Sequence, residues 1–174
     1  MKKVRLATLF SGIGAPEQGA IRAYDDVDIV FACEYDKFAR QSYKANYNID
    51  NKHFHENVYN FNAKMYKTKV DILVWGFPCT SYSMAGLRKG MSDEKTGDLF
   101  HEGLRILKEC MPEYTIVENV KGLLSIDDGK TIKLILKDLA DAGYMLNINI
   151  VNTKNHGVPQ NRERVFIVGK RIDE

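Results

Sequence analysis

Short apolar runs alternate with helix-like segments along this chain of 174 residues. Four of the runs are rich in β-branched and aromatic residues, as is typical of strands: Val4 to Phe10, Asp28 to Cys33, Val70 to Trp75 and Tyr114 to Asn119. Strands separated by helices usually pair in parallel, and a parallel sheet carries helices on both faces. The alternation predicts an α/β fold with a mostly parallel, twisted sheet.

Helical segments fill most of the intervals between these runs. Their expected limits are Pro16 to about Tyr24, Asp36 to Tyr47, Leu99 to Cys110 and Thr131 to Ala142. The last segment has the clearest pattern, with one apolar face made of Ile132, Ile135, Leu136 and Leu139. Two further β-prone stretches, Leu146 to Thr153 and Val165 to Val168, have no helix between them. They predict an antiparallel pair at one edge of the sheet.

Composition argues against several classes of protein. The three cysteines, Cys33, Cys79 and Cys110, form no C-x-x-C pair, and the histidines have no ligand spacing, so we expect neither disulfides nor a metal site. No apolar run approaches a membrane span, and no signal-peptide pattern opens the sequence. The formal net charge of +2 permits nucleic-acid binding without arguing for it. We expect a single domain, residues 1–174, in the cytoplasm.

The loop "FSGIGA" (Phe10 to Ala15) joins the first strand to the first helix. Gly12 and Gly14 would let its backbone approach a ligand, although a plain strand–helix turn is an equally good interpretation of the loop alone. Glu34 ends the second strand about twenty residues later, where α/β folds place an acid on ribose hydroxyls. Adjacent Tyr35 could cover an adenine. Because the third glycine of a dinucleotide fingerprint is missing, the pattern favours a nucleoside cofactor without a pyrophosphate.

The segment "GFPCTSYS" places Cys79 just after the strand that ends at Trp75. Proline and hydroxyl-bearing neighbours argue against a core cysteine, and the scattered histidines argue against a metal ligand. A nucleophilic thiolate is the remaining role. Glu118 leaves another strand at the same expected edge, although a salt-bridging acid is the commoner role there. Arg162 and Arg164 in "QNRER" share one side of an extended segment and could clamp oxygens, or form a surface charge cluster with Glu163.

Five motifs in order resemble the DNA (cytosine-5)-methyltransferases over essentially the whole chain. They are "FSGIG" from Phe10, Glu34, "GFPC" from Gly76, "ENV" from Glu118 and "QNRER" from Gln160. The resemblance implies a Rossmann-like S-adenosylmethionine-dependent methyltransferase fold. It also implies S-adenosylmethionine as methyl donor, S-adenosylhomocysteine as product, and double-stranded DNA as substrate, within DNA methylation and restriction-modification.

The resemblance also implies a cofactor pocket. The loop residues Phe10, Ser11, Gly12, Ile13 and Gly14 would hold the methionine end of the cofactor, Glu34 its ribose, and Tyr35 its adenine face. Asn57 stands where the family usually has an aspartate for the adenine amino group, and an amide oxygen can accept that hydrogen bond. The remaining lining would come from Val58, Phe77 and Leu99.

The resemblance gives the other motifs their chemistry. Cys79 would add to C6 of cytosine, Glu118 would hold and protonate N3, and Arg164 with Arg162 would hold O2. Thr80 stands where the family usually has glutamine. The target base must leave the duplex, and the segment 80–97, with Arg88, Lys89 and Lys95, would close over it.

The family normally continues beyond "QNRER" with a target-recognition region. We therefore expect no target-recognition domain within residues 1–174. A second chain that supplies it, a truncated product and a chain inactive alone all remain open. A related branch methylates cytosine C5 in tRNA with the same catalytic set, so tRNA remains an alternative substrate. The source expected from the resemblance is a bacterium or phage.

Overall fold

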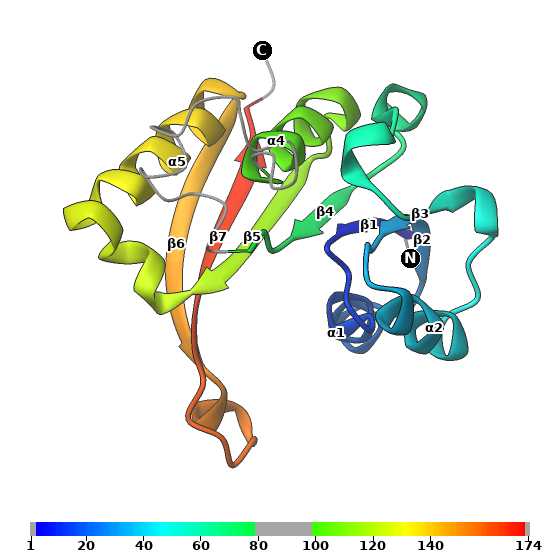
Figure 1. Cartoon of the computed structure of the whole chain (residues 1–174), viewed down its shortest axis with the longest axis horizontal. Helices are drawn as coiled ribbons and strands as arrows, with labels where there is room; N and C mark the ends of the chain where they lie inside the picture. Colours follow the sequence, from blue (N-terminus) through cyan, green and yellow to red (C-terminus); the bar gives the residue numbers. More distant parts are fainter. Residues whose placement is uncertain (1–2, 79–98, 173–174) are drawn as a thin grey trace.

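The computed structural model describes residues 3–78 and 99–172 (Figure 1). Strands are β1 Val4–Leu9, β2 Val27–Cys33, β3 Phe54–His55, β4 Ile72–Trp75, β5 Tyr114–Val120, β6 Tyr144–Asn152 and β7 Glu163–Arg171. Helices are α1 Ala15–Ala23, α2 Lys37–Asn46, α4 Leu99–Cys110 and α5 Lys130–Asp141. These limits agree with the predicted elements to within three residues, except for the unpredicted β3. None of the described helices is long and apolar enough to cross a membrane.

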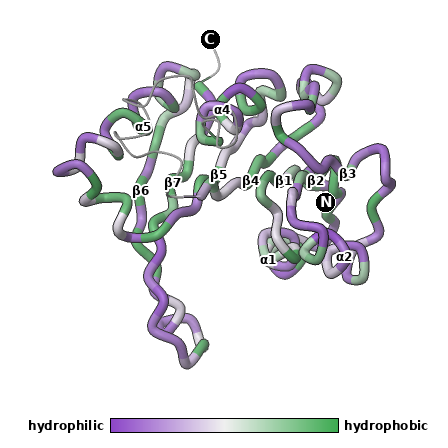
Figure 2. Tube along the Cα trace, viewed as in Figure 1, coloured by the Kyte–Doolittle hydropathy of each residue, from purple (hydrophilic) through white to green (hydrophobic). Residues whose placement is uncertain are grey.

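The described strands form one sheet in the order β3-β2-β1-β4-β5-β7-β6. Pairing is parallel from β3 to β5, whereas β7 is antiparallel to both β5 and β6. The predicted parallel sheet and its antiparallel edge pair are both confirmed. Parallel pairing brings the carboxyl ends of β1, β2, β4 and β5 to one edge of the sheet. The connection between β6 and β7 is mostly hydrophilic in Figure 2. It begins near the same edge, because β7 is antiparallel to both β5 and β6 and the end of β6 therefore lies on the same side as the end of β5.

Helices lie on both faces of the sheet, but they cover it unevenly (Figure 1). On one face, α4 packs so closely on β4 that a Cβ added to Gly103 would lie 2.3 Å from the Trp75 ring. Residues on this face, such as Leu73 and Val117, are almost fully buried. The other face of β4, β5 and β7 is only half-buried, and it carries Ile72, Val74, Tyr114, Ile116, Phe166 and Val168. Part of that face forms a cavity of about 330 Å³.

Candidate active site

The loop after β1 has a tightly constrained backbone. Phe10 and Gly12 both have left-handed backbone conformations, with φ of 54° and 56°. Gly14 has φ of 93°, and a Cβ there would lie 2.1 Å from the Tyr47 ring. The Tyr47 hydroxyl donates to the Gly14 carbonyl at 2.7 Å, which fixes the loop from below. A left-handed phenylalanine is costly, and such strain is retained where the surrounding structure imposes it, often at ligand sites.

Glu34 lies directly beside this loop, one residue after β2. Its Oε2 accepts from the Gly12 N–H at 2.7 Å, and its Oε1 accepts from the Asp36 N–H at 2.8 Å. An ionised carboxylate has about four acceptor positions, so both oxygens keep a free lone pair for hydroxyl donors. The main chain therefore holds Glu34 in a fixed orientation that suits recognition of a diol.

Apolar side chains flank this carboxylate on the surface. Ile13 is 61% exposed and Tyr35 is 80% exposed, although both are large and hydrophobic. Ser11 differs, because it is buried and its hydroxyl faces the Cys33 main chain, donating to the carbonyl at 3.1 Å. The Ser11 N–H also donates to the Cys33 carbonyl at 3.1 Å, and the Ser11 carbonyl accepts from the Gly14 N–H at 3.0 Å. Ser11 therefore holds the loop in place, whereas Ile13 and Tyr35 can offer a ligand side-chain surface.

Asn57 and Val58 follow β3 at the same edge. The Glu34 N–H donates to the His55 carbonyl at 3.0 Å, which joins the ends of β2 and β3. Asn57 caps the short 3-10 helix Val58–Asn60, and its Oδ1 accepts from the Tyr59 N–H at 3.0 Å. Val58 is buried. The predicted ribose and adenine residues thus lie on neighbouring strand ends.

Sequence reasoning missed a buried acid beneath the loop, Glu17 in α1. It is fully buried, and its Oε1 accepts from the Thr8 hydroxyl at 2.5 Å and from the Tyr43 hydroxyl at 2.8 Å. Its Oε2 has no hydrogen-bond partner among the described residues. Burial raises the pKa of the Glu17 carboxyl, although the two hydroxyl donors oppose that shift. An acidic side chain in the first turn of a helix normally interacts favourably with the helix dipole from an exposed position. The sequence therefore contains no sign that Glu17 is buried.

A second group of site residues lies where β4 and β5 end. Arg164 Nε lies 2.9 Å from Glu118 Oε1 in an ion pair. Glu118 also lies against Gly76, where an added Cβ would be 3.0 Å from Oε2. The Asn119 side-chain amide donates to the Phe77 carbonyl at 2.9 Å, which fixes the chain as it leaves β4. The structure thus brings Glu118, Arg164 and the start of "GFPC" together.

Arg162 lies elsewhere, in the turn before β7. Its side chain is exposed, and within the described ranges no hydrogen bond or ion pair engages its guanidinium. Its main-chain N–H donates to Asn152 Oδ1 at 3.3 Å. The expectation that Arg162 and Arg164 together hold the base therefore remains a prediction.

Cys79 and Thr80 lie outside the described residues, as do Arg88, Lys89 and Lys95. The residues on either side of this segment are described. Phe77 is buried and its ring meets that of Phe100 edge to face, with centroids 5.2 Å apart. Leu99, the first residue of α4, is half-buried and packs against the hydrophobic core that contains both rings. Phe77 and the start of α4 are thus held in one aromatic cluster.

No group of three or more histidine, cysteine or acidic side chains suited to a metal occurs within residues 3–78 and 99–172.

Residues 4–174 match the family model of the C-5 cytosine-specific DNA methylase. The chain belongs to this family. It is 41% identical over 169 residues to the type II methyltransferase M.Bsp6I of Bacillus sp. (strain RFL6), which covers 97% of this chain and 52% of that protein. It is 40% identical over 176 residues to the orphan methyltransferase M.Rho11sI of Bacillus phage rho11s, which covers 99% of this chain and 34% of that protein.

Solved methyltransferase structures share the fold. The crystal structure of the S. pombe Dnmt2 methyltransferase superposes with a TM-score of 0.80 at 24% identity, covering 99% of this chain and 52% of that one. A putative DNA modification methyltransferase from an E. coli prophage superposes with a TM-score of 0.74 at 23% identity, covering 97% and 47%. The predicted Rossmann-like methyltransferase fold is confirmed. The chain spans about a third to a half of the length of the curated relatives named here.

Proposed function

We propose that residues 1–174 form one catalytic domain that transfers a methyl group from S-adenosylmethionine to C5 of a flipped-out cytosine in double-stranded DNA. One observation carries the proposal: two separate constellations lie at the carboxyl edge of one sheet. Glu34 and the Gly12 loop follow β2 and β1, whereas Glu118 and Arg164 lie where β4 has just ended. A cofactor and a base bound at these two places would share one edge of the sheet.

The residues of the first constellation fit S-adenosylmethionine. Glu34 offers lone pairs to ribose hydroxyls, Tyr35 and Ile13 offer apolar surface, and Asn57 offers an amide oxygen to an adenine amino group. We propose that Phe10 to Gly14 supply main-chain groups to the methionine end, with Val58, Phe77 and Leu99 as lining. When bound, this cofactor supplies an electrophilic methyl group and leaves as S-adenosylhomocysteine.

The second constellation fits a cytosine ring activated by a thiolate. Cytosine C5 is a weak nucleophile, and the Cys79 thiolate would bond to C6 as the C5–C6 π electrons move toward N3. Protonated Glu118 would donate to N3 as that charge develops, while Arg164, supported by Arg162, would hold O2. After C5 has gained the methyl group, N3 would return its proton to Glu118, and loss of the C5 proton to solvent would expel Cys79 as thiolate and restore the aromatic ring.

We propose that sequence reading depends on polypeptide outside residues 1–174, either further sequence or a second chain. The named curated relatives are about two to three times as long as the matched region. The half-buried sheet face that carries Ile72, Ile116 and Val168 supports this view, because an apolar face of that kind is usually covered. We place the activity in the cytoplasm of a bacterium or of a phage-infected cell, since the named curated relatives come from a bacterium and a phage.

The proposal is tested by methyl transfer from radiolabelled S-adenosylmethionine. Two proteins are assayed: the chain alone, and a fusion of residues 1–174 to the part of M.Bsp6I that this chain does not cover, hereafter the fusion. Each is given duplex DNA or tRNA, and the labelled product is digested and identified. We expect 5-methylcytosine in DNA from the fusion. Label in tRNA alone would show that the substrate is RNA, and label in neither nucleic acid would contradict the proposal.

A further inference from the structure

We infer that Arg105 in α4 is a positioning residue for adenine recognition, because it holds the main chain that presents Asn57 and Val58. The inference rests on the proposed cofactor site. Arg105 lies in the middle of α4, outside every sequence motif that pointed to that site.

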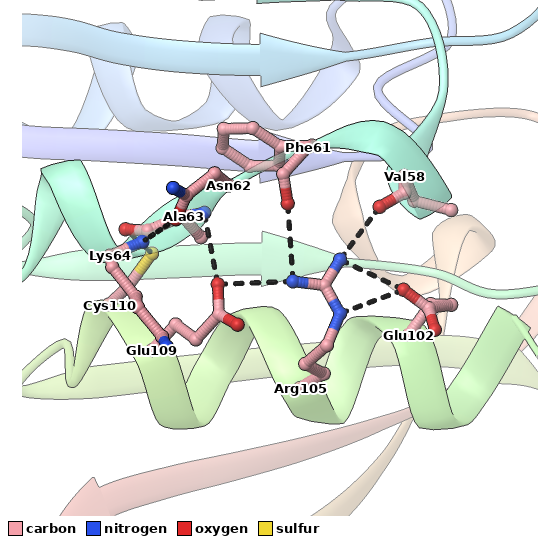
Figure 3. A network of polar contacts seen from close by, with 9 residues as sticks. All are labelled: Val58, Phe61, Asn62, Ala63, Lys64, Glu102, Arg105, Glu109 and Cys110. Carbon is pink, nitrogen blue, oxygen red and sulfur yellow. Dashed lines mark hydrogen bonds and ion pairs between the residues drawn. The ribbon is translucent and has the colours of Figure 1, made fainter.

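The Arg105 guanidinium joins α4 to the segment 58–63 (Figure 3). It donates to the Val58 carbonyl at 2.8 Å and to the Phe61 carbonyl at 3.2 Å. Two acids of α4 hold it in place, Glu102 at 2.9 Å and Glu109 at 3.0 Å. Glu109 extends the connection, since its Oε2 also accepts from the Ala63 N–H at 3.0 Å.

The segment has little regular structure of its own. The 3-10 helix Val58–Asn60 is three residues long, and its closing hydrogen bond from the Phe61 N–H to the Val58 carbonyl is 3.5 Å long. The bond from Arg105 to the same Val58 carbonyl is much shorter, and a charged donor makes a stronger hydrogen bond than a neutral one. The charged clamp from α4 is therefore a strong polar anchor of this turn.

The 3-10 turn at Val58–Asn60 also orients the side-chain amide of Asn57. Asn57 Oδ1 accepts from the Tyr59 N–H, so the plane of the Asn57 amide is set by the position of Tyr59 within the turn. A shift of the Val58 and Phe61 carbonyls would move that N–H and the amide with it. Amide oxygens discriminate an adenine amino group from a carbonyl only when they are held in place, because an unfixed group can rotate to accommodate either.

The chain offers a matched control in Arg5 of β1. The Arg5 guanidinium likewise bonds a carboxylate, Asp71 at 2.7 Å, and a main-chain carbonyl, Thr68 at 3.0 Å. It lies at the opposite edge of the sheet from the cofactor loop, at the second residue of β1. Arg5→Met therefore removes the same kind of clamp and the same charge without touching segment 57–63.

The test measures Kd by calorimetry for S-adenosylhomocysteine and for its 6-oxo analogue S-inosylhomocysteine. We expect the wild-type chain to prefer the adenine nucleoside. Arg105→Met should weaken S-adenosylhomocysteine binding by about tenfold or more, but S-inosylhomocysteine by less than about threefold, so that the preference collapses. Arg105→Lys, which can reach one carbonyl, should retain part of the preference, and Arg5→Met should leave it unchanged.

Several outcomes would overturn the inference: equal loss of both ligands in Arg105→Met, no loss of either, or a wild-type chain that binds both ligands equally well. A wild-type chain that binds neither ligand would contradict the proposed function instead. Hydrogen exchange in the ligand-free protein tests the role of Arg105 separately from cofactor binding. Arg105→Met should speed exchange in residues 57–63 while β4 and β5 stay protected, and unchanged exchange there would show that Arg105 does not order the segment.

Discussion

The two halves of the site hold their key carboxylates in different ways. Glu34 is fixed by two main-chain N–H groups, at 2.7 and 2.8 Å. Glu118 is fixed by a side chain, the Arg164 guanidinium at 2.9 Å, and lies against Gly76. The main chain therefore fixes the proposed cofactor half in advance, whereas the proposed base half depends on an ion pair.

This difference separates binding from chemistry. A carboxylate held by main-chain donors keeps its place, which suits a permanent binding contact. A carboxylate paired with a guanidinium side chain is held less rigidly, which suits the proton transfer proposed for Glu118. We expect changes in the base half to reduce the rate of transfer, and changes in the cofactor half to reduce affinity.

The largest effect is expected from Cys79→Ser in the fusion. A serine hydroxyl is far less nucleophilic than a thiolate at neutral pH, so kcat should fall by at least about 10³-fold. S-adenosylhomocysteine affinity should stay within about twofold, because this change removes no expected cofactor contact. Measurement of kcat and of S-adenosylhomocysteine Kd tests directly whether chemistry and cofactor binding depend on different residues. Near-normal methylation by the serine variant would contradict the proposed role of Cys79 as nucleophile.

Glu118→Gln comes next. It removes the acid that should protonate N3, and it leaves Arg164 without its ion-pair partner. We expect kcat to fall by about 10² to 10⁴-fold, the range for loss of a general acid. Glu163→Gln is the matched control, because Glu163 is an exposed acid paired with Lys121 on the neighbouring segment. If the two variants lose activity equally, Glu118 has no special role.

Glu34→Gln should weaken cofactor binding, and its effect should be smaller than the loss of kcat in the two previous variants. The new amide would direct an N–H group at the Gly12 or Asp36 N–H, so S-adenosylhomocysteine Kd should rise by about ten- to a hundredfold. At saturating cofactor, kcat of the fusion should change little. Glu56→Gln is the control, since Glu56 is an exposed acid near the same edge and such surface pairs contribute little. A kcat loss without a change in Kd would reverse the assignment of the two halves.

The smallest effect concerns Glu17, the buried acid beneath the cofactor loop. Burial raises its pKa above the ordinary value of 4.5, so the folded protein holds this proton more tightly than the unfolded chain does. The free energy of unfolding should therefore fall as pH rises from about 4.5, until Glu17 has also ionised in the folded state. Urea unfolding of Glu17→Gln across that window should show a shallower fall than wild type. Identical slopes would mean that Glu17 has an ordinary pKa.

Sequence patterns located elements well where a strand or helix buries a periodic set of apolar residues, as β4, β5, α4 and α5 do. Thus α4 begins at Leu99 and ends at Cys110, as predicted. The strand β3 was missed because two residues, Phe54 and His55, cannot show a period. Its existence depends on parallel pairing with Ala32 and Cys33, which is a property of the folded chain.

The placement of Glu34 and Glu118 near strand ends could be predicted, because an apolar run before each residue marks the strand, whereas their roles stay predictions. The site was not predictable where a side chain acts through main-chain groups far along the chain. Arg105 contacts carbonyls 44 and 47 residues away, and an arginine in a helix gives no sign of such partners. Glu17 was missed for the same reason, because its partner Tyr43 is 26 residues away on another helix.

The central claim is that Cys79 attacks cytosine C6 beside Glu118 and Arg164. It is tested most directly by mass spectrometry of the fusion incubated with S-adenosylmethionine and duplex DNA containing 5-fluorocytosine. Fluorine at C5 cannot leave as a proton does, so the covalent intermediate should persist. We predict a stable protein–DNA adduct that requires S-adenosylmethionine, maps to Cys79 and is absent from Cys79→Ser. A fusion that methylates ordinary DNA but forms no adduct at Cys79 would contradict the account.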